Sequence, residues 1–316
     1  MRYREFGGKR TAVVALGSTD FGGRFSEGQC REFMDAYEAI GGNFLDTARI
    51  YGDFVGKRQG ESEKVIGRWL EARDRDAFFL STKGAHPDPD HMEIGRLSRG
   101  EVTDDFRRSL ENLRTDYVDI YWLHRDDRSR AVGDIVETLN SLLETGGTRL
   151  VGVSNWSPER IREANAYAAA HGLHGIDANQ PRYSLARQMT VEDPTLYPMD
   201  AETDRLHRET GLTLVPFSSQ AKGFFSKLFA LGPEGLPEKT RRRFYCPGNL
   251  EIYERVLRVR EETGLSVGAI ALAFLTCQPY PTFPLAGVSR VSQVEALAEA
   301  GDAVITDAQR DYLFHF

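Results

Sequence analysis

Three segments decide the fold of this chain: NFLDTARIYG at residues 43–52, AFFLSTKGAH at 77–86 and YVDIYWLHRD at 117–126. Each begins as an apolar run rich in residues that favour β-strands, and each run stops at or just before a polar residue. Those polar residues are Asp46, Lys83 and His124, and Tyr51 lies near the end of the first segment. We therefore expect consecutive strands whose ends bring a carboxylate, a phenol, an ammonium and an imidazole onto one rim.

Outward from these segments, the chain keeps alternating between strand-like and helix-like stretches. Strands are predicted at 13–16, 43–47, 78–83, 117–124, 150–154, 175–180, 212–218 and 282–286. Helices are predicted at 27–40, 61–72, 101–113, 132–145, 158–170, 199–210, 250–262, 267–276 and 292–300. Eight strands alternating with helices favour a closed α/β fold, the (β/α)8 TIM barrel, over an open doubly wound sheet. An open sheet that binds dinucleotides usually carries GxGxxG after its first strand, which LGSTDFGG at 16–23 does not match.

We expect one barrel domain over residues 1–316, with an N-terminal β-hairpin around Gly7 and Gly8. The least regular segment is 221–249, which follows the seventh strand on the side where barrel enzymes carry their active sites. It is predicted as a long loop over the active-site face, serving either as a lid or as a plain surface loop. Capping patterns predict helix starts at Ser98, Ser157 and Thr306.

The bulk composition excludes several classes of protein. With 41% hydrophobic and 28% charged residues, the chain can bury a sizeable core. A net charge of −7 argues against a nucleic-acid partner. The cysteines Cys30, Cys246 and Cys277 lie far apart, which favours a reduced, cytoplasmic setting. The start has no apolar signal segment, and the stretch SVGAIALAFLTC from Ser266 is too short to span a bilayer.

A tyrosine beside a lysine in an apolar setting is a potential proton donor. A lysine cation about 4 Å away, at an effective dielectric of about 20, favours phenolate by roughly 4 kcal/mol, enough to make Tyr51 a usable general acid. Asp46 would hold Lys83 charged and oriented, while His124 would donate a hydrogen bond to a carbonyl oxygen or relay a proton. These groups supply no reductant, so a hydride must come from a cofactor.

Each of these residues has a structural explanation when taken alone. An aspartate after a strand often caps a helix, a tyrosine or histidine is often core, and a lysine at a strand end is usually solvated. Their joint occurrence at consecutive strand ends favours catalysis instead. Asp119, inside the third segment, is by contrast predicted to be a structural carboxylate that faces backbone or an arginine.

Taken together, GGNFLDTARIYG at 41–52, LSTK ending at Lys83 and DYVDIYWLH ending at His124 resemble the signature of the aldo-keto reductase family. The later segments LVGVSNW (150–156), IDANQPRYS (176–184), LVPFSSQAKGFF (214–225) and PLAGVSR (284–290) resemble that family in the same order. The resemblance implies a barrel closed at its bottom by the hairpin. It also implies that Tyr51 is the proton donor, that Lys83 makes it more acidic and that Asp46 pairs with Lys83. His124 would orient the carbonyl.

The resemblance further implies a nicotinamide cofactor, NADPH or NADH, bound extended across the rim. Ser154, Asn155 and Gln180 would bind its carboxamide, and Phe217 stands where the family usually stacks a tyrosine. Arg290 lies where relatives often contact the adenosine 2′-phosphate, which a guanidinium suits, so we expect NADP, with NADPH preferred over NADH. The full set of expected cofactor residues is Ser18, Thr19, Asp46, Ser154, Asn155, Gln180, Phe217, Ser218, Gln220, Gly287, Ser289, Arg290 and Gln293.

Besides Phe217, one stretch and one further residue depart from the family pattern. Ser218-Ser219-Gln220 replaces the usual SPL, which leaves the pyrophosphate contacts open. Leu297 replaces an asparagine that many relatives carry near the adenine.

The substrate is expected to be a small carbonyl compound or the corresponding alcohol, with no metal, no nucleic-acid partner and no membrane insertion. The residues expected near the pocket mouth are Asp20, Phe21, His86, Trp122, Arg125 and Trp156. The two tryptophans are equally consistent with ordinary packing, whereas Asp20 and Arg125 suit a hydroxylated substrate.

The leading hypothesis is therefore an NADP-dependent reductase of aldehydes or ketones, including sugar-like carbonyls. One alternative is a cofactor-binding regulatory subunit resembling potassium-channel β subunits, which retain the same four residues. A barrel hydrolase or isomerase using Asp46 and Glu61 ranks last, because it leaves Tyr51 and Lys83 unexplained.

Overall fold

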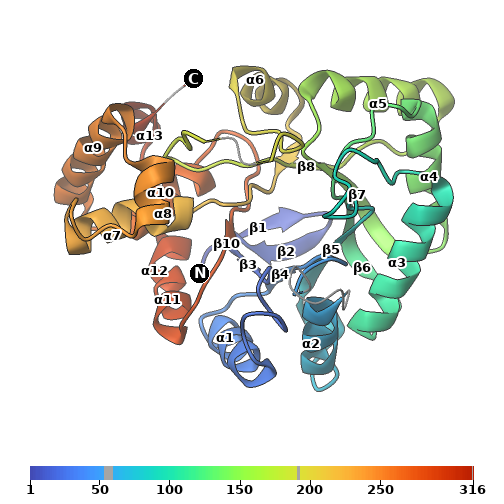
Figure 1. The fold of residues 1–316 in the computed structure, drawn as a ribbon, viewed down its shortest axis with the longest axis horizontal. Helices are drawn as coiled ribbons and strands as arrows, with labels where there is room; N and C mark the ends of the chain where they lie inside the picture. The colour runs from blue at the N-terminus through green and yellow to red at the C-terminus, as the bar shows by residue number, and fades with distance from the viewer. Residues whose placement is uncertain (53–59, 191–192, 315) are drawn as a thin grey trace.

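The fold is a ring of parallel strands surrounded by helices (Figure 1). The computed structural model describes residues 1–52, 60–190, 193–314 and 316. Within them, eight strands pair in the order β10-β3-β4-β5-β6-β7-β8-β9. Their bounds are β3 (Ala15–Gly17), β4 (Phe44–Asp46), β5 (Phe79–Gly84), β6 (Val118–Leu123), β7 (Thr148–Ser154), β8 (Ala178–Gln180), β9 (Thr213–Leu214) and β10 (Leu285–Ala286). A parallel bridge between Leu214 and Thr282 joins the two ends of the sheet, as the predicted (β/α)8 barrel requires.

Helices follow the strands and cover the outside of the barrel. Those after the first six barrel strands are α1 (Glu27–Ala39), α2 (Glu61–Leu70), α3 (Arg99–Leu113), α4 (Val132–Glu144), α5 (Pro158–His171) and α6 (Ala201–Thr210). The later ones, most of which gather at the left of Figure 1, are α7 (Phe224–Leu231), α8 (Glu238–Phe244), α9 (Pro247–Thr263), α10 (Val267–Thr276), α11 (Val291–Glu295), α12 (Leu297–Asp302) and α13 (Asp307–Leu313). Two short 3-10 turns lie at η1 (Arg75–Ala77) and η2 (Ala221–Gly223).

The segment 221–249 is more regular than its sequence predicted. Instead of one long loop, it folds as η2, α7, α8 and the first turn of α9. Further along the chain, the single helix predicted at 292–300 is two short helices, α11 and α12, which meet at Ala296. The seventh and eighth strands are also shorter than predicted, at two residues each.

Side-chain caps fix three helix starts where the sequence predicted them. Ser98 forms a capping box with Glu101, and Thr306 forms one with Gln309. Ser157 accepts a hydrogen bond from the Arg160 amide, with Pro158 in the first turn. These caps satisfy amides that would otherwise lack partners at the helix ends.

The barrel interior is filled by alternate residues of each strand. Inward positions low in the barrel are apolar, and they form one buried cluster of Phe6, Ala15, Phe44, Phe79, Ile120, Trp122, Ala178, Val215, Phe283 and Leu285. Continuing two residues further along three of these strands leads to Asp46, Ser81 and His124. Because side chains alternate between faces along a strand, the polar residues at the rim stand directly above this apolar filling.

The hairpin of β1 (Tyr3–Phe6) and β2 (Lys9–Ala12) closes the barrel floor, as predicted. Its Phe6 ring stacks on Phe79 at 4.6 Å and on Phe283 at 5.1 Å between centroids. Gly7 and Gly8 have φ of 56° and 79°, a backbone conformation that favours glycine. The floor is therefore sealed by an aromatic side chain held on a tight turn.

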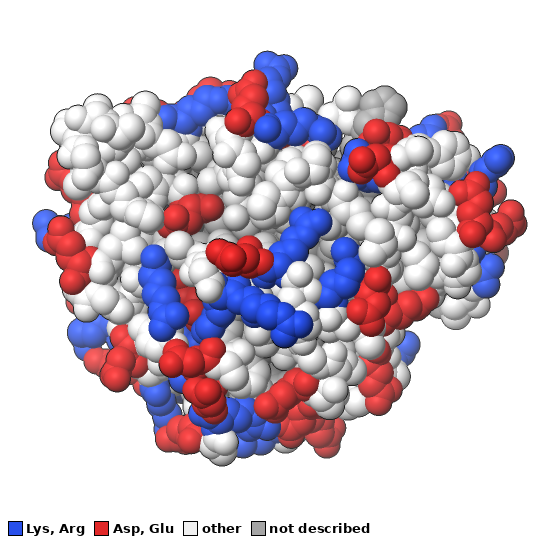
Figure 2. All heavy atoms as spheres, turned by 180° about the vertical axis from the view of Figure 1, so that it is seen from behind, with Lys and Arg blue, Asp and Glu red and all other residues white. Residues whose placement is uncertain are grey.

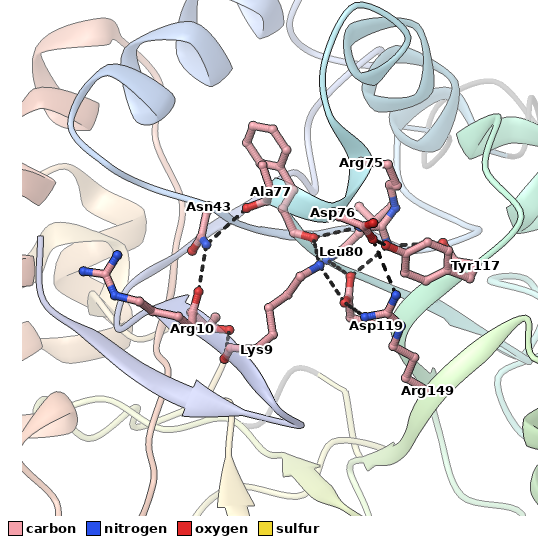
Figure 3. A network of polar contacts seen from close by, with 12 residues as sticks. Lys9, Arg10, Asn43, Arg75, Asp76, Ala77, Leu80, Tyr117, Asp119 and Arg149 are labelled. Carbon is pink, nitrogen blue, oxygen red and sulfur yellow. Dashed lines mark hydrogen bonds and ion pairs between the residues drawn. The ribbon is translucent and has the colours of Figure 1, made fainter.

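Asp119 anchors this hairpin to the barrel (Figure 3). Its carboxylate accepts hydrogen bonds from the Leu80 amide at 2.8 Å, from the Arg75 guanidinium at 2.8 Å and from the Lys9 ammonium at 2.9 Å. Arg149 lies further away, at 3.9 Å. The sequence prediction of a structural carboxylate that faces backbone or an arginine is therefore confirmed.

The surface carries charges of both signs. Figure 2 shows Lys and Arg gathered near the middle of one face, with acidic side chains among and around them. Among the helices that the structure describes, none is both long and apolar enough to cross a membrane.

Candidate active site

A buried ion pair between Lys83 and Asp46 lies at the centre of the rim. Lys83 Nζ donates to Asp46 Oδ2 at 2.5 Å and to the Thr47 carbonyl at 2.8 Å. The other carboxylate oxygen, Oδ1, accepts Ser81 Oγ at 2.7 Å and Gln180 Nε2 at 3.2 Å. Burial would lower the pKa of Lys83, but the Asp46 charge and then Tyr51 outweigh it, so the pKa is raised overall. Lys83 is therefore a cation at neutral pH.

Tyr51 faces this cation from the turn after β4. Lys83 Nζ lies 4.7 Å from the centroid of the Tyr51 ring, and Tyr51 is one of the groups that raise the pKa of Lys83. On its other side, the Tyr51 ring meets the His124 ring edge to face, with centroids 5.7 Å apart. The phenol is thus held between an ammonium and an imidazole.

His124 directly follows β6 and is 7% exposed. Burial, and then the neighbouring His86, Arg125 and Lys83, hold its pKa well below the ordinary value, so the ring is neutral at pH 7. Its Nδ1 is buried without a hydrogen-bond partner among the described residues. Since a buried N–H without an acceptor is costly, we assign the single ring proton to Nε2.

Three predicted carboxamide-binding residues converge at the neighbouring strand ends. Ser154 ends β7 opposite Gln180, which ends β8. Ser154 Oγ donates to the Gln180 carbonyl at 2.8 Å and accepts Asn155 Nδ2 at 2.9 Å. The two amides and the hydroxyl retain donor and acceptor capacity beyond these bonds, so the donor set fits a carboxamide. Phe217 is half-buried and packs against the apolar barrel filling.

The remaining predicted cofactor residues fall into two further places. Ser18 is buried against the Asp46 carbonyl, and Thr19 next to it is exposed. On the far side, Gln220 Oε1 accepts a hydrogen bond from the Gly287 amide at 3.1 Å and so joins the connections that follow β9 and β10. The exposed residues Ser218, Ser289 and Arg290 lie on these same two connections, and Gln293 accepts the Ser289 amide at 2.8 Å. Leu297 is buried and faces the core.

The predicted substrate residues differ in exposure. Trp122 and Trp156 are both completely buried, which favours the packing interpretation. Phe21 is also buried, in the main core cluster, and Asp20 is exposed, 3.9 Å from Arg24.

Arg125 joins His124 to a loop that follows β8. Its guanidinium donates to the His124 carbonyl at 2.8 Å, to Thr195 Oγ1 at 2.9 Å and to Asp193 Oδ2 at 3.1 Å. The Tyr197 amide donates to Asn155 Oδ1 at 3.2 Å, so the same loop is fastened twice.

Two features of the site were missed from the sequence. Ser81 binds Asp46, and its position two residues before Lys83 on the same strand face was the available signal. The loop at 193–197 had no signal, because its contacts depend on tertiary packing. Three non-glycine residues in the connections after β5, β7 and β9 also have positive φ, namely Ala85 at 57°, Asn155 at 64° and Ser218 at 55°. Such strained conformations gather at functional sites.

A parallel barrel whose rim holds a buried lysine–aspartate pair, a tyrosine and a neutral histidine is the architecture of a carbonyl oxidoreductase. The chain belongs to the aldo/keto reductase family, whose model matches residues 13–314.

Named relatives match nearly the whole chain at low identity. Norsolorinic acid reductase B of Dothistroma septosporum is 26% identical, over 98% of this chain and 80% of that protein. An aryl-alcohol dehydrogenase of Pestalotiopsis microspora is 26% identical, over 92% and 75%. A protein of Arabidopsis thaliana, named a probable voltage-gated potassium channel subunit beta, is 25% identical, over 96% and 92%. The family thus includes reductases, dehydrogenases and proteins named for a channel.

Proposed function

We propose that this chain reduces aldehydes or ketones to alcohols with NADPH, and that Tyr51 is the proton donor. The observation that carries the proposal is the Tyr51 phenol held between the buried Lys83 ammonium and the neutral His124 ring. Family membership supports carbonyl reduction in general. The reduced nicotinamide would supply the hydride, and the chain's own residues supply the rest.

Tyr51 provides the proton that the carbonyl oxygen needs as negative charge develops on it. Lys83 stays charged because Asp46 pairs with it, so the phenolate left behind faces a fixed cation. At about 4 to 5 Å and an effective dielectric near 20, such a cation stabilises the phenolate by roughly 3 to 4 kcal/mol. This stabilisation is organised before the reaction begins, which is the most effective form of electrostatic catalysis.

His124 holds the carbonyl oxygen in place. A neutral ring with its proton on Nε2 donates one hydrogen bond and adds no charge that would compete with Lys83. The Asn155 amide and the Arg125 guanidinium both donate to the His124 carbonyl, so the backbone of this residue is fixed.

The cofactor would lie across the strand ends from the centre towards β10. Ser154, Asn155 and Gln180 would bind its carboxamide, and Phe217 would stack on the ring, since stacking needs only an aromatic face. Arg290 is exposed, and its Nε donates to Ser292 Oγ at 3.1 Å, so a guanidinium at the surface supports a role with the 2′-phosphate of NADP.

The decisive variant is Tyr51→Phe, which removes the hydroxyl and keeps the ring. We expect turnover of a broad aldehyde and ketone panel to fall at least about 100-fold. Binding of NADPH, followed by fluorescence titration, should change less than about threefold. Equal losses in turnover and in binding would contradict the role of Tyr51. Absence of NADPH oxidation by the parent protein with every member of the panel would overturn the proposed function itself.

Cofactor preference is tested with Arg290→Met. We expect the dissociation constant for NADPH to rise about tenfold or more, because a charged hydrogen bond to phosphate is lost. The constant for NADH, which lacks that phosphate, is the internal control and should hardly move. An equal change for both cofactors would remove Arg290 from this role.

A second candidate function is regulatory, as a cofactor-binding subunit of a membrane protein. It is favoured by the relatives named as potassium channel β subunits. Tight NADPH binding with negligible turnover, together with a stable complex with a channel, would favour it over the enzyme. We propose a cytoplasmic location for either activity, because Cys30, Cys246 and Cys277 lie far apart in the sequence, as is common in a reduced setting.

A further inference from the structure

A second imidazole, that of His86, stands beside His124 at the rim. The two rings meet edge to face, with centroids 4.6 Å apart and planes at 76°. His86 lies two residues after β5 and is only half-buried, whereas His124 is almost fully buried. The mechanism of carbonyl reduction uses His124 and leaves His86 without a role.

The hydrogen bonding of His86 defines which ring nitrogen carries the proton. Its Nδ1 lies 2.6 Å from the Pro87 carbonyl oxygen, which can only accept, so Nδ1 must be the donor. Burial, and then the Arg125 charge, lower the pKa of His86 to about 4, so the ring is neutral at pH 7. A neutral ring that donates from Nδ1 has a bare lone pair on Nε2. Among the described residues, no donor contacts Nε2. This nitrogen is also not enclosed in the protein, since the buried polar atoms that lack a partner do not include it.

The position of His86 is built by groups outside the catalytic four. Asp105, on α3, is 6% exposed and accepts the Ala85 amide at 2.9 Å. Arg96 donates to that same carboxylate oxygen and to the His86 carbonyl, both at 3.0 Å. Ala85 itself is held at φ 57°, in the left-handed region. A buried carboxylate, an arginine and a strained residue together place this imidazole, which a surface histidine would not need.

The groups around His86 and His124 are mostly hydrogen-bond donors, whereas His86 Nε2 is an acceptor. Tyr51 and His124 both offer hydrogens to the carbonyl oxygen. Arg125 is nearby, and its three nitrogens already donate to His124, Thr195 and Asp193. Asp193 is paired with Arg125, and Asp105 with Arg96, so both nearby carboxylates are already engaged by guanidinium groups.

We propose that His86 is a specificity-determining residue, whose Nε2 accepts a hydrogen bond from a hydroxyl group that the substrate carries next to its carbonyl. The inference rests on the proposed function and narrows its substrate class to hydroxyaldehydes and hydroxyketones. The carbonyl oxygen is bound by Tyr51 and His124, and the hydroxyl on the adjacent carbon donates to His86. A site with a placed acceptor discriminates against a substrate that cannot fill it, because the acceptor is then left unpaired.

The test compares substrates of similar size that differ in a single group. One series is hydroxyacetone, methoxyacetone and butanone, and a parallel series is glycolaldehyde, methoxyacetaldehyde and propionaldehyde, each with NADPH. We expect kcat/KM of the parent protein for the hydroxy compound to exceed that for the other two about tenfold or more. The methoxy compounds separate donation from polarity, since a methoxy oxygen cannot donate.

Two variants then assign the preference to His86. In His86→Phe, which keeps a planar ring, the hydroxy-to-alkyl ratio of kcat/KM should fall to about one. In His86→Gln, which restores an acceptor, the ratio should lie between those of His86→Phe and the parent protein. Using a ratio within each variant removes general losses of activity, and circular dichroism checks that each variant folds. If His86→Phe does not fold, the parent series and His86→Gln decide.

The possible failures are distinguishable. If the parent protein reduces other carbonyls but does not favour the hydroxy compounds, the inference is overturned and the proposed function stands. The inference is also overturned if the preference survives unchanged in His86→Phe. If no carbonyl compound of any kind is reduced, the proposed function fails first.

Discussion

Lys83 and Asp46 form an ion pair of 2.5 Å in which neither side chain is more than 1% exposed. Taking two charges out of water is costly, and the cost is offset only when further hydrogen bonds satisfy both partners. Here Thr47, Ser81 and Gln180 supply those bonds. The pair therefore depends on all of its contacts, and removing one charge leaves the other stranded.

The first prediction concerns Asp46→Asn, which keeps the shape of the side chain and removes its charge. We expect the free energy of unfolding to fall by about 3 kcal/mol, because Lys83 becomes a buried, uncompensated cation. Turnover should fall about 100-fold or more, since Lys83 then loses its proton more readily. Urea unfolding and NADPH oxidation measure the two effects.

As a control, Glu111→Gln breaks an exposed pair with Arg107 and should cost at most about 0.5 kcal/mol. Similar losses of stability in both variants would contradict this account of the pair.

The second prediction concerns Gly152, on β7 beneath the rim. A methyl group there would overlap Cε3 and Cζ3 of Trp122, which fills the barrel interior below His124. Gly152→Ala should therefore cost about 1 to 3 kcal/mol of stability through overpacking. The matched control is Gly248→Ala near the start of α9, where no atom lies within 4 Å of the added methyl. That variant should be neutral or up to about 1 kcal/mol more stable, by helix propensity. Thermal unfolding of the two proteins side by side is sufficient, and equal melting temperatures would count against tight packing at Trp122.

The third prediction concerns the attachment of the hairpin at the barrel floor. Lys9 lies 2.9 Å from Asp119, and both side chains are largely buried, whereas Arg149 lies 3.9 Å away and is 49% exposed. Asp119→Asn should cost about 3 kcal/mol. In double-mutant cycles, we expect the Lys9–Asp119 coupling energy to exceed the Arg149–Asp119 coupling energy by at least about 1 kcal/mol. Comparable coupling energies would contradict a leading role for the Lys9–Asp119 pair in holding the hairpin.

The fourth prediction concerns pH and His207, on α6 and remote from the four rim residues. The ring is completely buried, its Nδ1 donates to the Leu212 carbonyl at 2.7 Å, and burial lowers its pKa from 6.5 to about 4. Between these values the unfolded chain binds a proton that the folded chain does not. The stabilisation is therefore fully present above pH 6.5 and is lost as the pH falls towards 4.

A variant without this imidazole isolates the effect. His207→Gln should be less stable than the parent protein at pH 7.5, and the gap should narrow by about 2 kcal/mol at pH 5. Urea unfolding at several pH values gives both curves, and other titrating groups cancel in the difference. A gap that is constant with pH would show that His207 titrates alike in the folded and unfolded chains.

Much of the architecture could be predicted from local patterns. The strands around Asp46, Lys83 and His124 stand out because each is an apolar run that ends in a polar residue, and this also predicts that the side chains converge. Their catalytic roles remain predictions. The burial of Trp122 was also accessible from the sequence, since it lies two residues after Ile120 and so shares the inward face.

Other parts of the structure had no local signal. The segment FFSKLFAL at 224–231 is one short helix, too brief to show a clear period, and it follows Gly223 in a left-handed conformation. The seventh strand ends early because Pro216 has no amide to donate and Ser218 has a positive φ. The bonds from Arg125 to Asp193 and Thr195 join residues about 70 positions apart, and only the closed barrel brings them together.

The left-handed residues at the rim have a consequence for attempts to make this protein withstand heat. Replacing Ala85 or Ser218 by glycine would relax the backbone, because glycine adopts a positive φ without strain. Relaxation there would also loosen the residues that follow β5 and β9, including His86. Improvements in heat resistance are therefore better sought in the outer helices, where a gain in rigidity does not compete with turnover.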